Sequence, residues 1–363
     1  MENNRIKVAV GLSGGVDSSV AAALLCRKGY DVIGIAMEIY DGPEGIRESG
    51  IHACYGPGEK EDTETAALVC KKLGIPFFVI DLREEFKKYV IDYLKKEYLS
   101  GRTPNPCVVC NRHLKFDFLL GKAKSAGIDF DFFSTGHYAR IDRSGEKILL
   151  KKASDPAKDQ TYFLYRLTDA QLSRALFPLG LLKKQKVREI ARDFGLITAE
   201  RPESQNFMTG EGYSSLFHPD EQREGDIVSE RGQILGKHGG IVNYTVGQRR
   251  GLGVVSSSRL YVTRIDALKN QIVIGDRKDL FSEGLIASDL NFIAISIPDQ
   301  SYRAKVKIRF RHTEVPATVF PLAKDRSIKV IFDRPQTSVT PGQSVVLYSG
   351  NTVLGGGTIE QAV

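Results

Sequence analysis

Apolar and polar positions follow two different periods along the chain, and the period changes after about residue 206. In the first part, continuous apolar runs predict buried strands at 6–12, 31–37, 75–82 and 131–139. Helical spacing of apolar residues predicts helices between them, at 16–29, 61–74, 83–99 and 116–127. Buried strands that alternate with helices predict an α/β fold with a doubly wound parallel sheet, whose ligands bind at the carboxyl ends of the strands.

In the second part of the chain, apolar and polar residues alternate over short segments, which is typical of β-strands. Residues 150–205 are still mixed, with one clear helical pattern at 183–196. From 206 to 282 glycine is frequent and helical spacing is absent, which predicts a small, β-rich central domain. From 283 to 363 alternating segments such as 302–310 and 327–333 predict a closed β-barrel. We therefore expect three domains, at 1–205, 206–282 and 283–363.

Composition narrows the class of protein. The chain has 363 residues, 42% hydrophobic and 26% charged, which is typical of a soluble protein with more than one core. Its first residues lack the pattern of a signal peptide, and no apolar run approaches the ~20 residues of a membrane span. Five cysteines fit a reducing compartment better than a disulfide framework, so we expect a cytoplasmic protein without membrane contact. The net charge of +7 is compatible with nucleic-acid binding but is weak evidence alone.

A glycine-rich loop, "GLSGGVDSS" at 11–19, follows the first predicted strand and opens the first predicted helix. Glycines let the backbone approach a ligand closely, and a helix N-terminus favours an anion. The loop lacks the lysine of the Walker pattern and the spacing of dinucleotide-binding loops. Its S-G-G-x-D-S pattern resembles the pyrophosphate loop of the ATP pyrophosphatases, in which Ser13, Ser18 and backbone amides would hold phosphate. Asp17 would bind Mg²⁺ or shape the loop.

Two cysteines, Cys107 and Cys110, lie in "NPCVVCN" at 105–111. Such a pair can hold a metal, act as a dithiol or deliver sulfur as a nucleophile. The neighbouring cations Arg112, His113 and Lys115, together with a helix start, predict lowered thiol pKa values. A zinc site is disfavoured, because no second Cys/His pair stands at ligand spacing.

Further motifs carry a resemblance that runs from residue 11 to about 360. They are "GRTPNPCVVCNRHLKFDFLL", "STGHYAR", "KDQTYFLYRL", "YTVGQRRGLG", "RFRHTEVPATV" and "TPGQSVVLYSGNTVLGGGTI". In this order they resemble the tRNA-specific 2-thiouridylases, a family of the PP-loop (ATP pyrophosphatase) superfamily. The resemblance implies a PP-loop catalytic domain, a small central domain and a tRNA-binding C-terminal β-barrel.

The resemblance also implies an activity and its partners. Such an enzyme adenylates O2 of the wobble uridine of tRNA with ATP and Mg²⁺, then replaces that oxygen with sulfur and releases AMP and pyrophosphate. The sulfur comes from sulfide or from a sulfur-carrier or desulfurase protein. By motif, ATP would be bound by Gly11, Leu12, Ser13, Gly14, Gly15, Val16, Asp17, Ser18, Met37 and Gly136. The tRNA would be contacted by Asn105, Pro106, Cys107, His137, Lys158, Asp159, Gln160, Arg309, Phe310 and Gln343. Cys110 would be the catalytic cysteine, assisted by Cys107 and Asp17.

The chain departs from the family at one functional position. The family has a second catalytic cysteine about 90 to 100 residues after the first, where this chain reads "PESQNFMTGEGY" with Asn206 or Met208 in its place. No cysteine follows Cys110. The usual exchange, in which one cysteine carries a persulfide and the other forms a disulfide with it, therefore cannot run between those two positions.

Three explanations stay open for this departure. Cys107 and Cys110 could act as the dithiol themselves. They could instead ligate a [4Fe-4S] cluster with Cys54 as the third thiolate, which is the interpretation that the sequence favours. The chain could also be a degenerate member that binds tRNA without thiolating it.

Two other functions compete with tRNA sulfur transfer. One is a different ATP pyrophosphatase-type ligase, and the other is an RNA-binding protein with a relict nucleotide domain. The ligase would release AMP without tRNA, and the binding protein would release none.

Overall fold

The computed structural model describes residues 5–42, 53–203, 206–208, 212–296, 299–322 and 326–363, which form two compact units. The first unit comprises Met1–Val90, Cys107–Gly210 and Asn351–Val353. The second comprises Ile91–Pro106, Glu211–Gly350 and Leu354–Val363. Within the described ranges, every helix is too short or too polar to cross a bilayer.

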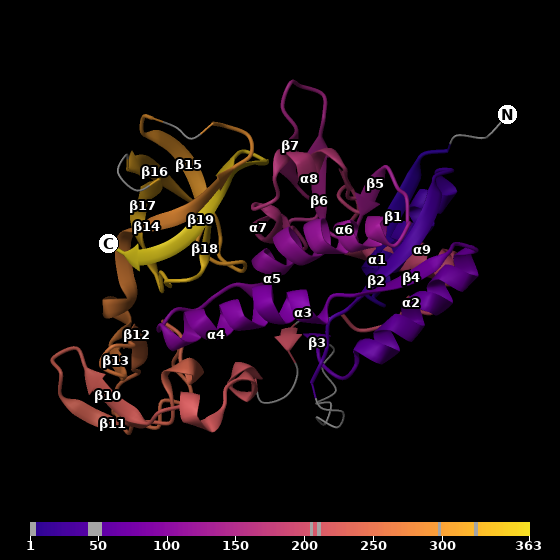
Figure 1. Cartoon of the computed structure of the whole chain (residues 1–363). Helices are drawn as coiled ribbons and strands as arrows, with labels where there is room; N and C mark the ends of the chain where they lie inside the picture. The colour runs from indigo at the N-terminus through magenta and orange to yellow at the C-terminus, as the bar shows by residue number, and fades with distance from the viewer. Residues whose placement is uncertain (1–4, 43–52, 204–205, 209–211, 297–298, 323–325) are drawn as a thin grey trace. The chain divides into compact units, whose positions relative to one another are not determined.

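A five-stranded parallel sheet forms the centre of the first unit, in the order β4-β2-β1-β5-β8. Figure 1 labels β1, β2, β4 and β5 of this sheet. Its strands are β1 (Lys7–Gly11), β2 (Asp31–Glu38), β4 (Phe77–Asp81), β5 (Phe132–Ser134) and β8 (Ala175–Leu176). The apolar residues of β1 are fully buried and pair in parallel with both β2 and β5, for example Val8 with Val32. The prediction of a doubly wound parallel sheet is confirmed.

Helices cover this sheet. Helix α1 (Val16–Arg27) packs against α2 (Glu59–Leu73) and α9 (Lys184–Asp193), and α6 (Leu119–Ser125) packs against β4. The alanine-rich stretch of α1 is fully buried, which allows its neighbours to approach closely. Two short helices, α7 (Thr161–Leu164) and α8 (Asp169–Ser173), follow the hairpin of β6 (Ala139–Asp142) and β7 (Leu149–Lys152).

The helical run that carries the cysteine pair begins earlier than predicted. It comprises α5 (Pro106–Val109), the π-helical segment η2 (Cys110–Phe118) and then α6. The predicted start at 116 is wrong, because Pro106 occupies the first helical position, where the missing N–H costs nothing. The predicted helix at 83–99 is present as α3 (Arg83–Phe86), the π-helical η1 (Lys87–Ile91) and α4 (Asp92–Leu99).

Two three-residue strands, far apart in the sequence, complete the first unit. Strand β3 (Ala53–Tyr55) pairs in parallel with β9 (Asn206–Met208). Tyr55 stacks on Phe86 of α3 at 5.1 Å and on Phe207 at 6.3 Å between ring centroids. These rings fasten the small sheet to the helical layer.

The second unit contains a four-stranded sheet in the order β11-β10-β13-β12. Its strands are β10 (Gly225–Ser229), β11 (Ile234–His238), β12 (Tyr261–Asp266) and β13 (Gln271–Gly275). Single-turn 3₁₀ helices accompany them at η3 (Gly212–Leu216), η4 (Pro219–Glu221), η5 (Ile241–Asn243) and η6 (Arg277–Leu280). The helix α4 belongs to this unit, where Lys95 pairs with Glu221 at 2.8 Å.

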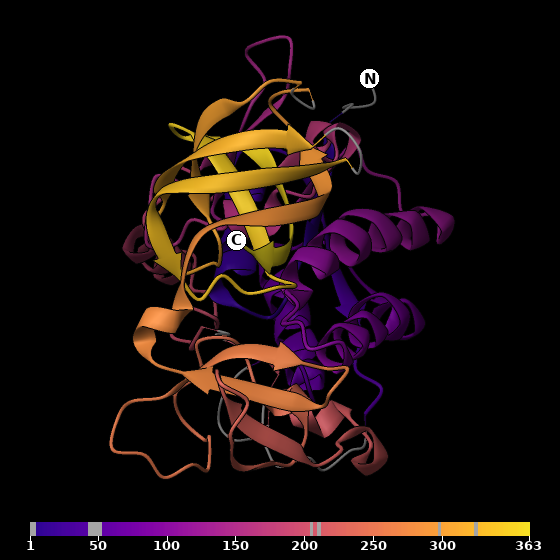
Figure 2. The ribbon, with the colours of Figure 1, turned by 90° about the vertical axis from the view of Figure 1, so that its left-hand side faces the viewer.

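A closed β-barrel fills the rest of the second unit (Figure 2). Its strands are β14 (Phe281–Phe292), β15 (Tyr302–Lys307), β16 (Val315–Leu322), β17 (Ser327–Thr337), β18 (Ser344–Ser349) and β19 (Thr352–Ala362). They pair in the order β14-β17-β16-β15-β18-β19, and β14 also pairs with β19, which closes the ring. Residues that point into the barrel, such as Val306 and Val330, are fully buried and belong to one hydrophobic core. The predicted barrel is therefore confirmed.

Candidate active site

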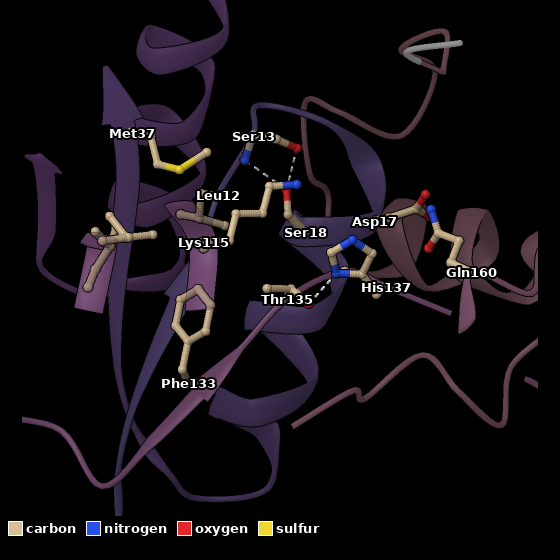
Figure 3. A pocket seen from close by; sticks show the side chains of 14 residues that line it. Leu12, Ser13, Asp17, Ser18, Met37, Lys115, Phe133, Thr135, His137 and Gln160 are labelled. Carbon is tan, nitrogen blue, oxygen red and sulfur yellow. Dashed lines mark hydrogen bonds between the residues drawn. The ribbon is translucent and has the colours of Figure 1, made fainter. Parts of the chain in front are cut away.

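A pocket opens at the carboxyl ends of β1, β2 and β5, where a parallel sheet places its ligands (Figure 3). Its lining comprises Gly11, Leu12, Ser13, Asp17, Ser18, Ile35, Met37, Lys115, Leu119, Phe133, Thr135, Gly136, His137 and Gln160. Its volume is about 180 Å³. That is below the ~300 Å³ at which pockets for drug-sized ligands begin, so a whole nucleotide would widen it or extend beyond it.

The glycine-rich loop forms one wall of this pocket. Ser18 Oγ accepts a hydrogen bond from the backbone N–H of Ser13 at 3.2 Å and lies 3.3 Å from Ser13 Oγ. Ser18 also donates to the carbonyl of Gly15, the residue that caps α1. The two serines therefore hold the loop in a tight curve, with their hydroxyls beside the N-terminus of a helix, a suitable place for a phosphate.

Two glycines are required by the close packing around this loop. Gly14 has φ +68°, and a Cβ there would lie 2.5 Å from the carbonyl oxygen of Asp62. Gly136 lies on the other side, where a Cβ would be 2.6 Å from both the carbonyl carbon of Asp17 and the backbone nitrogen of Ser18. Gly136 thus brings the segment after β5 against the loop. Gly14, Gly15 and Val16, which were also expected to bind ATP, are not among the residues that line the pocket.

Asp17 is held by two partners. Lys184 of α9 donates to both carboxylate oxygens, at 2.7 and 2.8 Å, and Tyr138 donates its hydroxyl at 2.8 Å. Burial, together with the Asp17 carboxylate, raises the pKa of Tyr138, which therefore stays a donor. These contacts tie Asp17, at the start of α1, to Lys184 of α9 and to Tyr138.

The same lysine extends this network to Glu203. Lys184 lies 3.0 Å from one oxygen of Glu203, and Lys158 lies 2.6 Å from the other. Burial acts to raise the pKa of Glu203, but hydrogen bonds from the two lysines outweigh it and lower that pKa. A chain of alternating charges therefore links Lys158, one of the residues expected to contact tRNA, with Asp17 in the loop.

Lys115 extends into the pocket toward the loop that carries Ser13 and Ser18 (Figure 3). It lies on η2, five positions after Cys110. A π-helix has about 4.4 residues per turn, so positions four and five apart share a face, whereas an α-helix would turn Lys115 away. The positive charge of Lys115 acts to lower the pKa values of Cys107, Cys110 and His137. The same cation therefore influences both the pocket and the two thiols.

The pKa values of Cys107 and Cys110 are raised, whereas the sequence predicted that they would be lowered. Burial raises the pKa of Cys107 to about 12 and of Cys110 to about 11, and Lys115 only partly offsets this effect. The predicted lowering is therefore wrong for the free protein. Arg112 and His113 face other partners: Arg112 donates to the carbonyl of Arg166 at 2.8 Å, and His113 stacks on Tyr89.

His137 lines the pocket and is held neutral. Burial and the charge of Lys115 lower its pKa well below the usual value. Its Nδ1 lies 2.7 Å from the hydroxyl of Thr135. A neutral imidazole with one nitrogen fixed by a hydroxyl can donate or accept a hydrogen bond toward a ligand.

The other residues expected at the tRNA make internal hydrogen bonds. Asp159 accepts from the backbone of Ala153 and the hydroxyl of Thr161, and Gln160 accepts from the backbone of Tyr138 at 2.8 Å. In the second unit, Arg309 donates to the carbonyls of Thr337 and Ser338, and the ring of Phe310 lies under Lys307.

Gln343 also belongs to the second unit and binds the segment that leads to the cysteine pair. Its side-chain amide donates to the carbonyls of Thr103 and Pro104, at 2.9 and 3.1 Å. The backbone N–H of Thr103 donates to the carbonyl of Pro341 at 2.8 Å. Asn105 and Pro106 follow directly, half-buried and buried, at the end of this fastened segment.

Cys54 lies on β3, an exposed position beside the strand that lacks the family's second cysteine. A negative charge at Cys54 would add to the effect of burial and raise the pKa values of Cys107 and Cys110, so the three thiols lie in one neighbourhood. They do not fit a cluster as arranged: in the described part of the chain, no three His, Cys, Asp or Glu side chains converge as metal ligands. The remaining cysteines, Cys26 and Cys70, pack in the core around α1 and α2.

Several residues of this site were not singled out from the sequence. Lys184 and Tyr138 reach Asp17 from more than a hundred positions away, and no local pattern signals such a partner. Thr135 and Phe133 could have been expected, because they end a predicted strand next to Gly136. Lys115 was noted only as a cation near the cysteines.

Three family models match the chain. Their descriptions are a tRNA methyl transferase HUP domain at 6–208, a tRNA methyl transferase PRC-barrel domain at 217–276 and an aminomethyltransferase beta-barrel domain at 282–359. The tRNA-specific 2-thiouridylase MnmA of Acetivibrio thermocellus is 46% identical over 361 residues, covering 98% of this chain and 99% of that protein. The protein of the same name from Clostridioides difficile is 45% identical, with the same coverage of each chain.

Proposed function

The chain belongs to the family of the tRNA-specific 2-thiouridylases, and from that premise we propose that it adenylates a uridine of tRNA with ATP and replaces O2 of that uridine with sulfur. The products are 2-thiouridine, AMP and pyrophosphate. The observation that carries this proposal is a single helical segment shared by both half-reactions. Lys115 of η2 lines the pocket beside the glycine-rich loop, and Cys110 begins the same segment.

In the first half-reaction, the loop supplies hydrogen-bond donors to phosphate. Ser13 and Ser18 line the pocket at the start of α1, so we expect their hydroxyls and free amides of this helix end to bind phosphate oxygens. The Lys115 ammonium adds a positive charge where the α-phosphate becomes bonded to the uridine oxygen and pyrophosphate leaves. Met37 and Phe133 offer apolar surface for the adenine.

Mg²⁺ enters as the ATP complex, because Mg²⁺ at such sites is bound largely by the substrate phosphates and water. Asp17 accepts hydrogen bonds from Lys184 and Tyr138, and through them it stabilises the conformation of the glycine-rich loop. These contacts of Asp17 favour a positioning role over direct binding of Mg²⁺.

In the second half-reaction, sulfur must attack C2 of the adenylated uridine with AMP as the leaving group. Cys110 is the proposed carrier, as a persulfide, which ionises more readily than a buried thiol. Lys115 favours that negative charge. Since the three cysteines do not meet as metal ligands, we derive no step through a cluster, and iron analysis of the purified protein tests this choice.

For tRNA, we propose that Asn105, Pro106 and Cys107 face the target base and that His137 contacts it from the pocket. Lys158, Arg309 and Gln343 would contact the rest of the tRNA, with Asp159, Gln160 and Phe310 beside them. The internal hydrogen bonds of several of these residues favour an additional role in shaping the surface.

The experiment loads the full chain with persulfide from sodium polysulfide, adds ATP, Mg²⁺ and a tRNA transcript, and then measures AMP and 2-thiouridine by mass spectrometry. We expect AMP to form only with tRNA and in step with 2-thiouridine. AMP without tRNA would instead favour another ATP pyrophosphatase-type ligase. Absence of AMP with retained tRNA binding would favour a binding protein.

A further inference from the structure

The short sheet of β3 and β9 places a cysteine beside the position where the family's second catalytic cysteine is missing. The strands pair in parallel, with Ala53 opposite Asn206 and Tyr55 opposite Met208. The two positions that align with the missing cysteine, Asn206 and Met208, therefore flank the level of Cys54 on the neighbouring strand. A thiol that is absent from one strand is present on the adjacent one.

The same sheet lies against the segment that carries Cys110. Tyr55, the residue after Cys54, stacks on Phe86 with ring centroids 5.1 Å apart. Phe86 ends α3, and α3 packs against η2, which begins at Cys110. Burial is the main cause of the raised pKa of Cys107 and Cys110, and a negative charge at Cys54 would raise both pKa values further, as expected for sulfurs in one neighbourhood.

We propose that Cys54 replaces the missing downstream cysteine as the thiol that releases sulfur from Cys110. This inference rests on the proposed function and extends it to a residue outside the family's usual pair. Cys54 is exposed, whereas Cys110 is only partly accessible. The exposed thiol is the one that a reductant can reach to begin the next turnover.

The step balances as a thiol–disulfide exchange. The terminal sulfur of the Cys110 persulfide attacks C2 of the adenylated uridine, and AMP leaves with the electrons of its C–O bond. The Cys54 thiolate then attacks Sγ of Cys110, and the S–S bond to the transferred sulfur breaks. The transferred sulfur takes that electron pair and stays on C2 as 2-thiouridine. Cys54 and Cys110 are left as a disulfide, which an external dithiol reductant reduces.

Cys107 is less suited to this exchange. Cys107 and Cys110 are three positions apart on one continuous helical run, which separates their Cβ atoms by about 5–6 Å. A disulfide needs Cβ atoms about 3.5–4.5 Å apart, so the first turn would have to open. Cys54 lies on a different element and can approach Cys110 without breaking a helix.

The test is a single turnover of the full chain, loaded with persulfide from sodium polysulfide and freed of excess reductant. After addition of ATP, Mg²⁺ and tRNA transcript, free thiols are alkylated and the protein is mapped without reduction. We expect a Cys54–Cys110 disulfide in proportion to the 2-thiouridine formed. For C54S, we expect AMP release to continue and 2-thiouridine to be lost, with recovery when dithiothreitol supplies the second thiol.

C26S is the matched control, since Cys26 lies in the core around α1, and it should behave as the parent. A parent disulfide between Cys107 and Cys110, unchanged turnover in C54S, or about four irons per chain that depend on Cys54 would overturn the inference. If the parent forms no 2-thiouridine, the proposed function itself fails.

Discussion

Lys184 Nζ lies 2.7 Å from one carboxylate oxygen of Asp17 and 2.8 Å from the other. This contact joins α9 to the start of α1, across 167 positions of the sequence. Because Asp17 follows the glycine-rich loop directly, the geometry of the loop depends on a lysine that lies far outside the motif.

Replacement of Lys184 by methionine should therefore disturb the loop as well as the fold. Among the residues that the structure describes, Asp17 would keep Tyr138 as its side-chain partner, and loss of a hydrogen bond to a charged group costs about 2 kcal/mol. We expect a lower free energy of unfolding by urea denaturation and a slower release of AMP. The control is K186M on the same helix, whose exposed pair with Glu189 is worth at most about 0.5 kcal/mol. Equal effects of the two variants would contradict this role.

Gly136→Ala should abolish ATP turnover while leaving the barrel intact. Its Cβ would lie 2.6 Å from backbone atoms of Asp17 and Ser18, which cannot move without opening the loop. The measurement is AMP formation, together with ATP binding by calorimetry. Gly121→Ala is the control, because a Cβ there meets open space on helix α6 and should stabilise it slightly. Normal ATP binding by G136A would refute the close packing.

The alkylation rate of Cys110 should rise with pH across the whole neutral and alkaline range. Its pKa is raised to about 11, so each unit of pH below that value changes the thiolate fraction about tenfold. Iodoacetamide labelling followed by peptide mapping measures this rate residue by residue. A plateau near pH 8 would show that the thiol is not held in the buried, protonated form.

Lys115→Met should slow that labelling further, because the positive charge that favours the thiolates of Cys107 and Cys110 is removed. The pKa of His137 should rise in the same variant, since Lys115 contributes to lowering it. NMR titration of the imidazole and iodoacetamide labelling measure the two effects. K147M, at an exposed loop position, is the control and should change neither quantity.

Gln343→Ala should destabilise the second unit even without tRNA. Two hydrogen bonds to the carbonyls of Thr103 and Pro104 would be lost, at about 1 kcal/mol each. Urea denaturation monitors this loss, and Q361A, at an exposed position of β19, is the control. If Q343A weakened tRNA binding alone, Gln343 would be a tRNA contact without a structural role.

The sheet and the barrel could be predicted from the sequence because their strands are long enough to show a period. Residues such as Val8 and Val330 fall in runs whose burial follows directly from apolar spacing. The start of the helical run at Pro106 could not be found this way, because its first turns carry polar residues and cysteines. The three-residue strands β3 and β9 are likewise too short for any pattern.

The motif residues that line the pocket could also be identified from the sequence. The pKa values of the nearby thiols and the hydrogen-bond partners of Asp17 could not. Seven of the residues expected to bind ATP line one pocket: Gly11, Leu12, Ser13, Asp17, Ser18, Met37 and Gly136. Thiol pKa values depend on burial, which tertiary packing decides, and so nearby cations in the sequence gave the wrong direction. The partners of Asp17 depend on contacts between distant segments.

The path of the chain between the two compact units has a practical consequence for dissecting the protein. Residues 91–106 belong to the second unit although the chain on both sides of them belongs to the first. A gene fragment that starts at residue 211 would lack α4 and Arg102, together with its ion pairs to Glu97 and Glu360. No single cut therefore yields both units intact, and a stable fragment of the second unit would need residues 91–106 grafted back through a designed linker.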